Sequence, residues 1–498
     1  MMHTMISLRN ILILTVAAAV VFTGDIYGQV SDEEVDKIEQ AMPVKPRVEP
    51  QENRRVLVFN RHEGYEHAAI AYAAKAMDIM AEKTGAFTVD HSTDMRAFRR
   101  RNLRKYDAII FNNTTQLKFE NERYRRALMD FIRDGKGIVG LHAASDNFYN
   151  WPEAAEMMGG LFDGHPWTSG GTWAIKVVDS EHSLTQSFDT EGFKISDEIY
   201  RIKEPFSREN LRVLVTLDMD DPTTKNAEGV KPTDTYIPIS WVRDYGDGRL
   251  FYCSFGHNPH IYWNTPILQH YLDGIQFAMG DLDAETTPTL IKDIASLRNY
   301  DYGMGREALT NIQDFLRKHN DDEEVLFRTE QRMLDVLRTD GTLAGKQFIC
   351  EQLRIIGGPE SVTVLNEMLT DAETSDMARY ALEKIDHPSA GQALRDALAE
   401  SQGNVLVGII NSVGNRQDAE AVDRLTEFLD DQDHYLYSAT LGALGQIGSD
   451  DALSALKNSM DTETGSRQAL AVNAYIEAAD NLALAGDTNQ AEIGRAHV

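Results

Sequence analysis

Apolar positions divide the chain into two regions with different spacing. From Arg55 to about Asp281, short apolar runs alternate with stretches in which apolar residues recur at helical spacing. The runs predict strands and the stretches predict helices, namely strands at 56–59, 87–91, 108–111, 138–141, 173–178, 211–217 and 237–242, and helices at 68–83, 120–133 and 266–279. Strands that alternate with helices are typical of a parallel sheet with right-handed crossovers, so this region is expected to be an α/β domain.

A turn pattern at Asp247 and Gly248 separates two apolar runs, 237–245 and 249–255. Such a pattern predicts a β-hairpin, which we place near one edge of the sheet. The sheet as a whole is still expected to be mostly parallel.

From about Ala284 onward the pattern is helical throughout. A small turn with Gly or Pro, followed by a helix rich in Ala and Leu, recurs with a period of about 30 residues. The recurring turns lie near Ile356, Ile385, Val413 and Ile447. This period predicts a HEAT-like all-α solenoid over 346–485, preceded by a helical connector over 282–345. The array is expected to be a scaffold, and a protein is the partner that such repeats would bind.

Both ends of the chain carry segments that we exclude from the fold. Residues 1–29 have a basic start, an apolar run from Ile11 to Phe22 and a polar end, which is the order of a secretory signal peptide. Prolines among charged residues at 30–54 then predict a linker. The tail, 486–498, contains EIGRAHV, which the start of a common sequencing adapter can encode, so we expect the natural protein to continue.

Composition limits the partners and the location. The formal net charge of −29 is spread along the chain, and such a surface repels nucleic acid and anionic membranes. The apolar run of the signal peptide is short for a bilayer, so no membrane span is expected after its cleavage. The two cysteines, Cys253 and Cys350, are expected to be buried apolar residues without a disulfide. We therefore expect a periplasmic or secreted protein.

The segment from Gly137 to Trp167 is the richest in chemically active side chains. It is interpreted as a buried strand that stops at His142, followed by a loop, a short helix and a second histidine, His165. Open α/β sheets hold ligands at the carboxyl ends of their strands, and His67 and His257 also follow predicted strands. A histidine there can act as an acid or base or bind a metal, and hydrogen bonding within the loop is the competing explanation.

Carboxylates and aromatic side chains accompany these histidines. Asp146 is expected to orient an imidazole or move a proton, and Glu198 is the preferred acid or base of the DEIY stretch. Flat aromatic faces stack on sugar rings, which makes Tyr149, Trp151 and Trp167 candidate substrate-binding residues. Capping by Asp146 and core packing of the tryptophans are the structural alternatives.

A divalent metal is an option that the sequence leaves open. Three histidines with a carboxylate would suit zinc or a similar ion, and the candidate ligands are His142, His165 and His257. The sequence contains no HExxH or CxxC spacing that would decide the question. It also lacks Walker and GxGxxG loops, so no nucleotide cofactor is expected.

Five motifs of the first region together resemble one known family. In chain order they are GLHAASDNFYNWPE, MMGGLFDGHPW, DEIYRIKEPFS, SWVRDYGDGRLFYCSFGHNPHIYWN and LQHYLDGIQFAMGDL. With them, the segment 55–281 resembles the ThuA family, named for trehalose utilisation, a branch of the class I glutamine amidotransferase-like fold. The resemblance implies a flavodoxin-like, mostly parallel sheet, in agreement with the predicted order of strands and helices.

One departure from the wider fold concerns the nucleophile. Amidotransferases carry a cysteine in a Gly-x-Cys-x-Gly elbow, and here the stretch GLHAA puts His142 where the thiol would be. Neither Cys253 nor Cys350 lies at a position to replace it, so the chain is not expected to be a glutaminase. The ThuA family shares this loss, and the resemblance implies sugar metabolism, with keto-disaccharides or glycosides among the substrates.

We interpret the chain as an exported enzyme of carbohydrate metabolism, a lyase, isomerase or hydrolase that acts on a sugar or glycoside by acid–base chemistry. The expected catalytic residues are His142, Asp146, Glu198 and His257. The expected substrate-binding residues are His67, Tyr149, Trp151, His165, Trp167 and Asn258. The alternative is a non-catalytic carbohydrate-binding domain on a protein-interaction solenoid, in which alanine at His142 would spare sugar binding.

Overall fold

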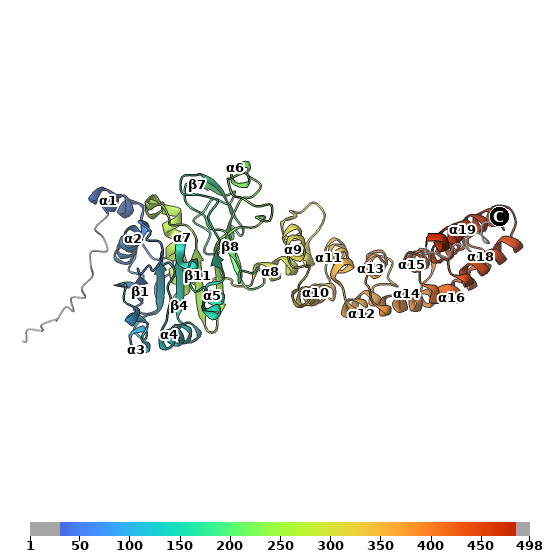
Figure 1. The fold of residues 1–498 in the computed structure, drawn as a ribbon, viewed down its shortest axis with the longest axis horizontal. Coiled ribbons are helices and arrows are strands. Elements are labelled where there is room, and N and C mark those ends of the chain that lie inside the picture. The colour runs from blue at the N-terminus through green and yellow to red at the C-terminus, as the bar shows by residue number, and fades with distance from the viewer. Residues whose placement is uncertain (1–29, 485–498) are drawn as a thin grey trace, which may run out of the picture. The chain divides into compact units, whose positions relative to one another are not determined.

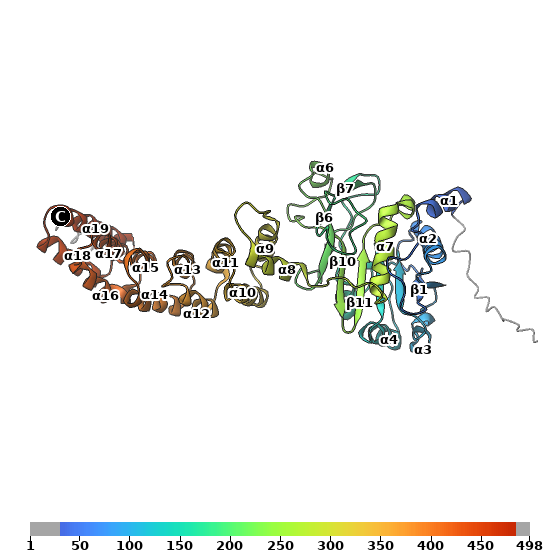
Figure 2. The ribbon, with the colours of Figure 1, turned by 180° about the vertical axis from the view of Figure 1, so that it is seen from behind.

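The computed structural model describes residues 30–484. The predicted signal peptide, 1–29, and the predicted tail, 486–498, lie outside the described residues. The chain divides into two compact units, one ending at Thr289 and the other starting at Leu290. Figures 1 and 2 show a mixed α/β unit and an all-helical unit. Within residues 30–484, no helix is both long enough and apolar enough to cross a membrane.

Eleven strands lie in the described part of the first unit, 30–289, and nine of them form one sheet. They are β1 (Arg55–Phe59), β2 (Thr88–Ser92), β3 (Ala108–Asn112), β4 (Gly137–Leu141), β5 (Leu161–Phe162), β6 (Trp173–Val177), β7 (Phe193–Ile195), β8 (Ile202–Lys203), β9 (Arg212–Leu217), β10 (Pro238–Tyr245) and β11 (Gly248–Cys253). The large sheet has the order β2-β1-β3-β4-β11-β10-β9-β6-β7, and β5 pairs with β8 separately.

The five strands from β2 to β11 in this order pair in parallel, and the other neighbours pair antiparallel. Two antiparallel steps restore the strand direction, so β9 and β7 again run in the direction of the parallel half. The expected α/β fold with a mostly parallel sheet is confirmed, and the parallel half has the flavodoxin-like order.

The predicted hairpin forms, but the structure corrects its position. Strands β10 and β11 pair through a turn at Gly246 and Asp247, yet β11 also pairs in parallel with β4. The hairpin therefore lies in the middle of the sheet, where it joins the parallel half to the antiparallel half. The short strand β7, which the sequence pattern did not reveal, is at the edge instead.

Helices cover both faces of the sheet. They are α1 (Asp32–Ala41), α2 (Ala69–Thr84), α3 (Arg100–Leu103), α4 (Glu122–Arg133), α5 (Pro152–Met158), α6 (Pro222–Lys225) and α7 (Thr265–Ala278). In β1, Val56 and Val58 share a core with α2 and α7, whereas Leu57 and Phe59 share a core with α4 and α5. Strands with both faces covered read as continuous apolar runs, which explains the pattern in the sequence.

Residues 30–54, which the sequence predicted as a linker, instead pack onto the α/β unit. Ile38 of α1 is fully buried and Met42 is 3% exposed, both in the core that contains α2 and α7. The backbone N–H of Arg47 donates to Gln276 Oε1 at 2.7 Å. Prolines suit an irregular strap of this kind as well as a linker, so composition alone does not separate the two.

The second unit is a stack of helix pairs. Its helices are α8 (Thr289–Ser296), α9 (Glu307–Lys318), α10 (Glu323–Leu337), α11 (Leu343–Ile356), α12 (Pro359–Glu367), α13 (Ser375–Leu382), α14 (Pro388–Glu400), α15 (Gly403–Asn415), α16 (Val422–Glu427), α17 (His434–Ile447), α18 (Asp450–Thr462) and α19 (Gly465–Leu484). From α10 onward, even-numbered and odd-numbered helices form two rows (Figures 1 and 2). One apolar core runs from Leu290 to Ala478, so the predicted connector shares its core with the repeats. The predicted helical solenoid is confirmed.

His270 on α7 makes the stability of the α/β unit sensitive to acid. The ring is fully buried, and burial lowers its pKa from 6.5 to about 4, although the Leu184 carbonyl bonded to Nδ1 favours the charged form. The unfolded chain protonates this group near pH 6.5, so its contribution to stability is present above 6.5 and is lost as the pH falls toward 4. We expect a loss of about 3 kcal/mol over that window, which His270→Gln removes. Urea unfolding at pH 7 and pH 4.5 tests this, and an equal pH slope in both proteins would contradict it.

Candidate functional site

The chain leaves β4 at Leu141 and turns sharply at His142. This residue begins the short helix η2 (His142–Ser145) with a φ of 45°, a left-handed conformation that is uncommon for residues other than glycine. Its imidazole is completely buried, and Nδ1 lies 2.7 Å from the carbonyl oxygen of Ser254. A carbonyl only accepts hydrogen bonds, so Nδ1 carries the hydrogen and Nε2 presents a lone pair.

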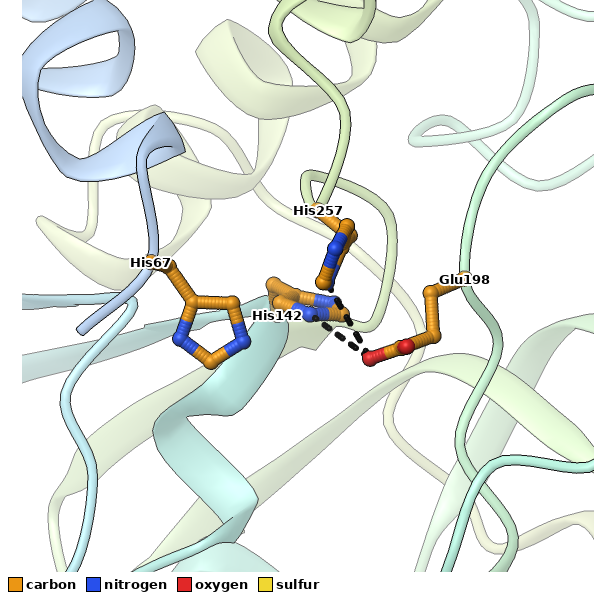
Figure 3. A group of neighbouring side chains, drawn as sticks. All are labelled: His67, His142, Glu198 and His257. Carbon is orange, nitrogen blue, oxygen red and sulfur yellow. Dashed lines mark ion pairs between the residues drawn. The ribbon is translucent and has the colours of Figure 1, made fainter. Parts of the chain in front are cut away.

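Three more side chains meet His142 at one edge of the sheet. His67 follows β1, Glu198 follows β7 and His257 follows β11. Because β1, β4, β7 and β11 run in the same direction, their carboxyl ends lie on the same side. One ligand atom from each of the four residues lies within 4.8 Å of all the others (Figure 3). The sequence predicted that these residues share a site, and the structure brings them together.

The cluster is tight and largely buried. Glu198 Oε1 lies 3.1 Å from His257 Nδ1 and 3.8 Å from His142 Nε2. The centroid of the His67 ring is 5.0 Å from that of His142 and 5.2 Å from that of His257, each pair edge to face. Within the described chain, three buried ring nitrogens have no hydrogen-bond partner: His67 Nδ1, His142 Nε2 and His257 Nδ1. The His257 nitrogen is nevertheless at ion-pair distance from Glu198 Oε1.

Burial and mutual repulsion set the charge of the cluster. Burial, followed by the nearby His257, lowers the pKa of His67 from 6.5 to about 4. Burial, together with His67 and His257, holds the pKa of His142 well below 6.5. Burial also acts on His257, but the Glu198 carboxylate outweighs it and raises the pKa of that ring. The two most buried rings are therefore neutral at pH 7, which is the form of imidazole that binds metal ions.

Tyr200 belongs to the site, although the sequence did not single it out. Its hydroxyl lies 3.4 Å from His67 Nε2, and its ring centroid is 4.5 Å from that of His142. Glu198 and Tyr200 flank Ile199, which forms a β-bridge with Trp167. In an extended segment, residues two apart project to the same side, so the Glu-x-Tyr spacing was the pattern that could have identified Tyr200.

His165, a candidate metal ligand in the sequence, lies beside the cluster rather than in it. Its Nδ1 is 3.3 Å from Glu198 Oε2, and about half of its side chain is exposed. Its ring stacks on that of Phe162 with centroids 5.9 Å apart. This exposed imidazole therefore contacts the outer oxygen of the carboxylate and is accessible to a ligand.

Asp146 contacts a tyrosine, not a histidine. The hydroxyl of Tyr149 donates to Asp146 Oδ1 at 2.6 Å, and burial raises the pKa of Asp146 although this hydrogen bond opposes the shift. The sequence offered Asp146 as a group that orients an imidazole, whereas the Ser254 carbonyl orients His142. Its second predicted task, proton transfer, stays a prediction. Tyr149 is 41% exposed and keeps a face for stacking.

Two predicted substrate-binding tryptophans lie in the core. Trp151 is 7% exposed and packs against Phe119 and Phe148, with centroids 5.4 Å and 5.6 Å away. Trp167 is fully buried, and its Nε1 donates to the carbonyl oxygen of Thr224 at 3.0 Å. The structure therefore corrects the expectation that these indoles present flat faces to a sugar.

Asn258, also expected to bind substrate, uses its amide within the protein. Its Nδ2 donates to the carbonyl oxygens of Ser169 at 2.9 Å and Ser196 at 3.1 Å. These bonds hold the turn that carries His257. A contact between Asn258 and a substrate stays a prediction.

Two family matches cover separate parts of the chain. Residues 55–278 match the ThuA family, described as trehalose utilisation. This segment forms a ThuA-like domain. Residues 403–475 match HEAT repeats, in agreement with the predicted repeat array. The ThuA description points to a carbohydrate-related role for the domain.

Solved structures of ThuA-like proteins resemble part of this chain. A ThuA-like protein from Bacteroides uniformis is 22% identical, and the match covers 46% of this chain and 92% of that protein with a TM-score of 0.38. A ThuA-like protein from Parabacteroides merdae is 19% identical and covers 47% and 93%, with a TM-score of 0.37. No curated protein matches the chain.

Proposed function

We propose that the ThuA-like domain is a metal-dependent enzyme that acts on a sugar or glycoside. In this proposal His67, His142, Glu198 and His257 hold one divalent ion. The observation that carries it is the cluster of three imidazoles beside the Glu198 carboxylate, in which the buried His142 Nε2 and His257 Nδ1 make no hydrogen bond. A buried polar atom without a partner costs about 1–3 kcal/mol, so a bound ligand that pairs these atoms would remove a substantial penalty.

The donor set suits zinc or a similar first-row ion. Three imidazole nitrogens with one carboxylate oxygen are ligands that zinc accepts, with bonds of about 2.0–2.2 Å. Donors around one tetrahedral ion lie about 3.4 Å apart, so the ligand atoms of this cluster, which lie within 4.8 Å of one another, would move together by up to about 1.4 Å on binding. The hydrogen bond from His142 to the Ser254 carbonyl fixes the ring, as outer hydrogen bonds do for metal-binding histidines.

The neighbouring residues would carry out the proton chemistry. A bound divalent ion would polarise a carbonyl or hydroxyl oxygen of the sugar. Asp146, held by Tyr149, would take a proton from the carbon next to a substrate carbonyl, and the electron pair of the C–H bond would shift onto the carbonyl oxygen. Isomerisation would follow when the enolate oxygen takes the proton of the neighbouring hydroxyl and the former carbonyl carbon takes back the proton held by Asp146, so that the carbonyl moves by one carbon. Elimination would follow when the enolate electrons expel a glycosidic oxygen from the next carbon and that oxygen takes the proton held by Asp146. Tyr200 would donate a hydrogen bond to the charged oxygen.

A keto-disaccharide is the substrate that suits this chemistry, because its carbonyl makes the neighbouring C–H bond acidic. The exposed rings of Tyr149 and His165 would orient the sugar. Thiol chemistry has no part in the proposal, since Cys253 and Cys350 are both buried.

The proposal also includes export of the protein and a protein partner for its helical repeats. The signal-peptide pattern of residues 1–29 supports export to the periplasm or beyond the cell. The HEAT repeats support binding of a protein partner by the solenoid.

The test is made on the purified chain from Val30 onward. Elemental analysis measures bound metal, and incubation with trehalose and its keto derivative is followed by mass detection of products. Bound metal with turnover supports the enzyme. Sugar binding without metal or turnover supports the alternative, a non-catalytic carbohydrate-binding domain.

Zinc is expected to stabilise the protein once bound metal has been removed with a chelator. A ligand at 100 times its Kd stabilises the folded state by about 2.7 kcal/mol, so the midpoint of thermal unfolding should rise with zinc concentration. Differential scanning calorimetry with and without zinc measures the shift. His257→Ala, which lacks one ligand, should show a smaller shift at the same zinc concentration, and an equal shift would argue against the site.

A further inference from the structure

A buried carboxylate next to Glu198 is not explained by metal binding. Asp197 is 0% exposed, and its two oxygens accept separate backbone hydrogen bonds. Oδ2 accepts the N–H of Gly256 at 2.7 Å, and Oδ1 accepts the N–H of Asn258 at 2.8 Å. These two residues are the chain neighbours of His257. One side chain therefore holds the backbone on both sides of a candidate ligand.

The turn that carries His257 has an unusual backbone. Gly256 has a φ of 126°, which only glycine adopts readily, and its carbonyl oxygen accepts the hydroxyl of Tyr262 at 3.1 Å. The backbone N–H groups of Gly256 and Asn258 make no backbone–backbone hydrogen bond and donate to Asp197 instead. The bonds to Asp197 therefore restrain the turn at these two N–H groups.

Asp197 also links two of the candidate ligands to each other. Glu198 is its neighbour in sequence, and Glu198 Oε1 lies 3.1 Å from His257 Nδ1. The carbonyl oxygen of Asp197 accepts Trp173 Nε1 at 3.0 Å, which anchors this backbone in turn. The side chain thus fixes the distance between a segment that follows β7 and a turn that follows β11.

We propose that Asp197 is the positioning residue of the metal centre, which holds the His257 turn so that the imidazole faces Glu198. The proposal rests on the metal-binding function proposed above and adds to it a residue outside the four ligands. Outer hydrogen-bond partners of metal sites change metal affinity by about 10- to 100-fold when replaced.

Asp197→Asn separates this role from simple packing. Asparagine has the same shape and leaves no cavity, but it presents an NH2 group where one backbone N–H needs an acceptor. One of the two hydrogen bonds is therefore lost, because the asparagine NH2 group and the backbone N–H opposite it are both donors. The His257 turn should be released while the fold is kept.

The experiment titrates the metal-free chain from Val30 with Zn2+ by calorimetry and with Co2+ by visible absorption. Asp197→Asn is expected to bind Zn2+ about 10- to 100-fold more weakly than the original protein. Its Co2+ spectrum should resemble that of His257→Ala, because both variants lose the same ligand. Asp273→Asn, which changes another buried carboxylate of the same domain, is the matched control and should leave the affinity unchanged.

A double-mutant cycle decides whether Asp197 acts through His257. In the His257→Ala background, Asp197→Asn should cause almost no further loss, whereas a general structural effect would add in full. Full additivity, or an unchanged affinity in Asp197→Asn, overturns the inference. Absence of Zn2+ binding by the original protein overturns the proposed function instead.

A second pair of variants covers the case in which Asp197→Asn does not fold. Asn258 has a φ of −84° and a ψ of 138°, which proline tolerates. Asn258→Pro removes the N–H that Asp197 accepts, and Asn258→Ala removes only the side chain. The proline variant should bind Zn2+ several-fold more weakly than the alanine variant, and equal affinities would overturn the inference.

Discussion

Alanine at His142 is expected to abolish metal binding and turnover together. His142 is the most deeply buried imidazole of the cluster, so its loss removes one of the four proposed ligands on the inner side of the site. We expect metal affinity to fall by more than about 100-fold, beyond the range for outer hydrogen-bond partners. Turnover should fall by at least about 1,000-fold, since the lost charge stabilisation is worth several kcal/mol. Metal analysis and product detection on the same preparation measure both.

His270→Ala is the matched control for this variant. His270 is equally buried in the same domain but bonds to Leu184 and Ser240, away from the cluster. It should lower stability without changing the amount of bound metal. Full metal content in His142→Ala would contradict the proposal that His142 is a metal ligand. Full metal content together with normal turnover would show that His142 has no part in the proposed reaction.

Gly256→Ala, which adds a single methyl group, is expected to destabilise the site more than such an addition at any other position there. A Cβ atom at Gly256 would lie 2.6 Å from Tyr262 Oη and 3.2 Å from Tyr271 Oη, in addition to the backbone strain at a φ of 126°. Strain of about 1–3 kcal/mol and overpacking of about 1–3 kcal/mol together predict a loss of about 2–6 kcal/mol in the free energy of unfolding. Metal affinity should fall as well, because the turn carries His257.

Gly280→Ala isolates the backbone part of this effect. Gly280 also has a positive φ, 84°, but a Cβ atom there would meet nothing within 4 Å. It should cost only about 1–2 kcal/mol and leave metal affinity unchanged. Denaturant unfolding of both variants compares the two losses, and equal losses would show that the clash with the tyrosine hydroxyls has no weight.

Much of the fold was predictable because its strands and helices are marked locally. The strand predicted at 138–141 is observed at Gly137–Leu141, and the helix predicted at 68–83 is observed at Ala69–Thr84. A buried parallel strand appears in the sequence as a continuous apolar run, and an amphipathic helix appears as apolar residues spaced three or four positions apart. The hairpin was predicted from its turn, but its place in the middle of the sheet depends on pairing with β4, which leaves no local trace.

The candidate site was predictable only in part. His142, His257 and Glu198 were expected because each follows a predicted strand or segment, and a sheet gathers the ends of strands that run in one direction. Burial was harder to predict. Trp151 is buried and Tyr149, two residues earlier in the same loop sequence, is exposed, so the local sequence does not separate the two. The task of Asp197 arises from two N–H groups about sixty residues away, and no spacing rule connects them.

With the proposed ion, the cluster at the sheet edge would also make metal uptake a measure of folding. Its members follow β1, β4, β7 and β11, so they are far apart in sequence and come together only through long-range pairing. Contacts of high sequence separation form late, because the entropy of closing large loops must first be overcome. A folding intermediate in which β11 has not yet paired with β4 would have most of its helices but would lack the metal site. Metal occupancy would therefore distinguish finished molecules from compact, unfinished ones that circular dichroism cannot separate.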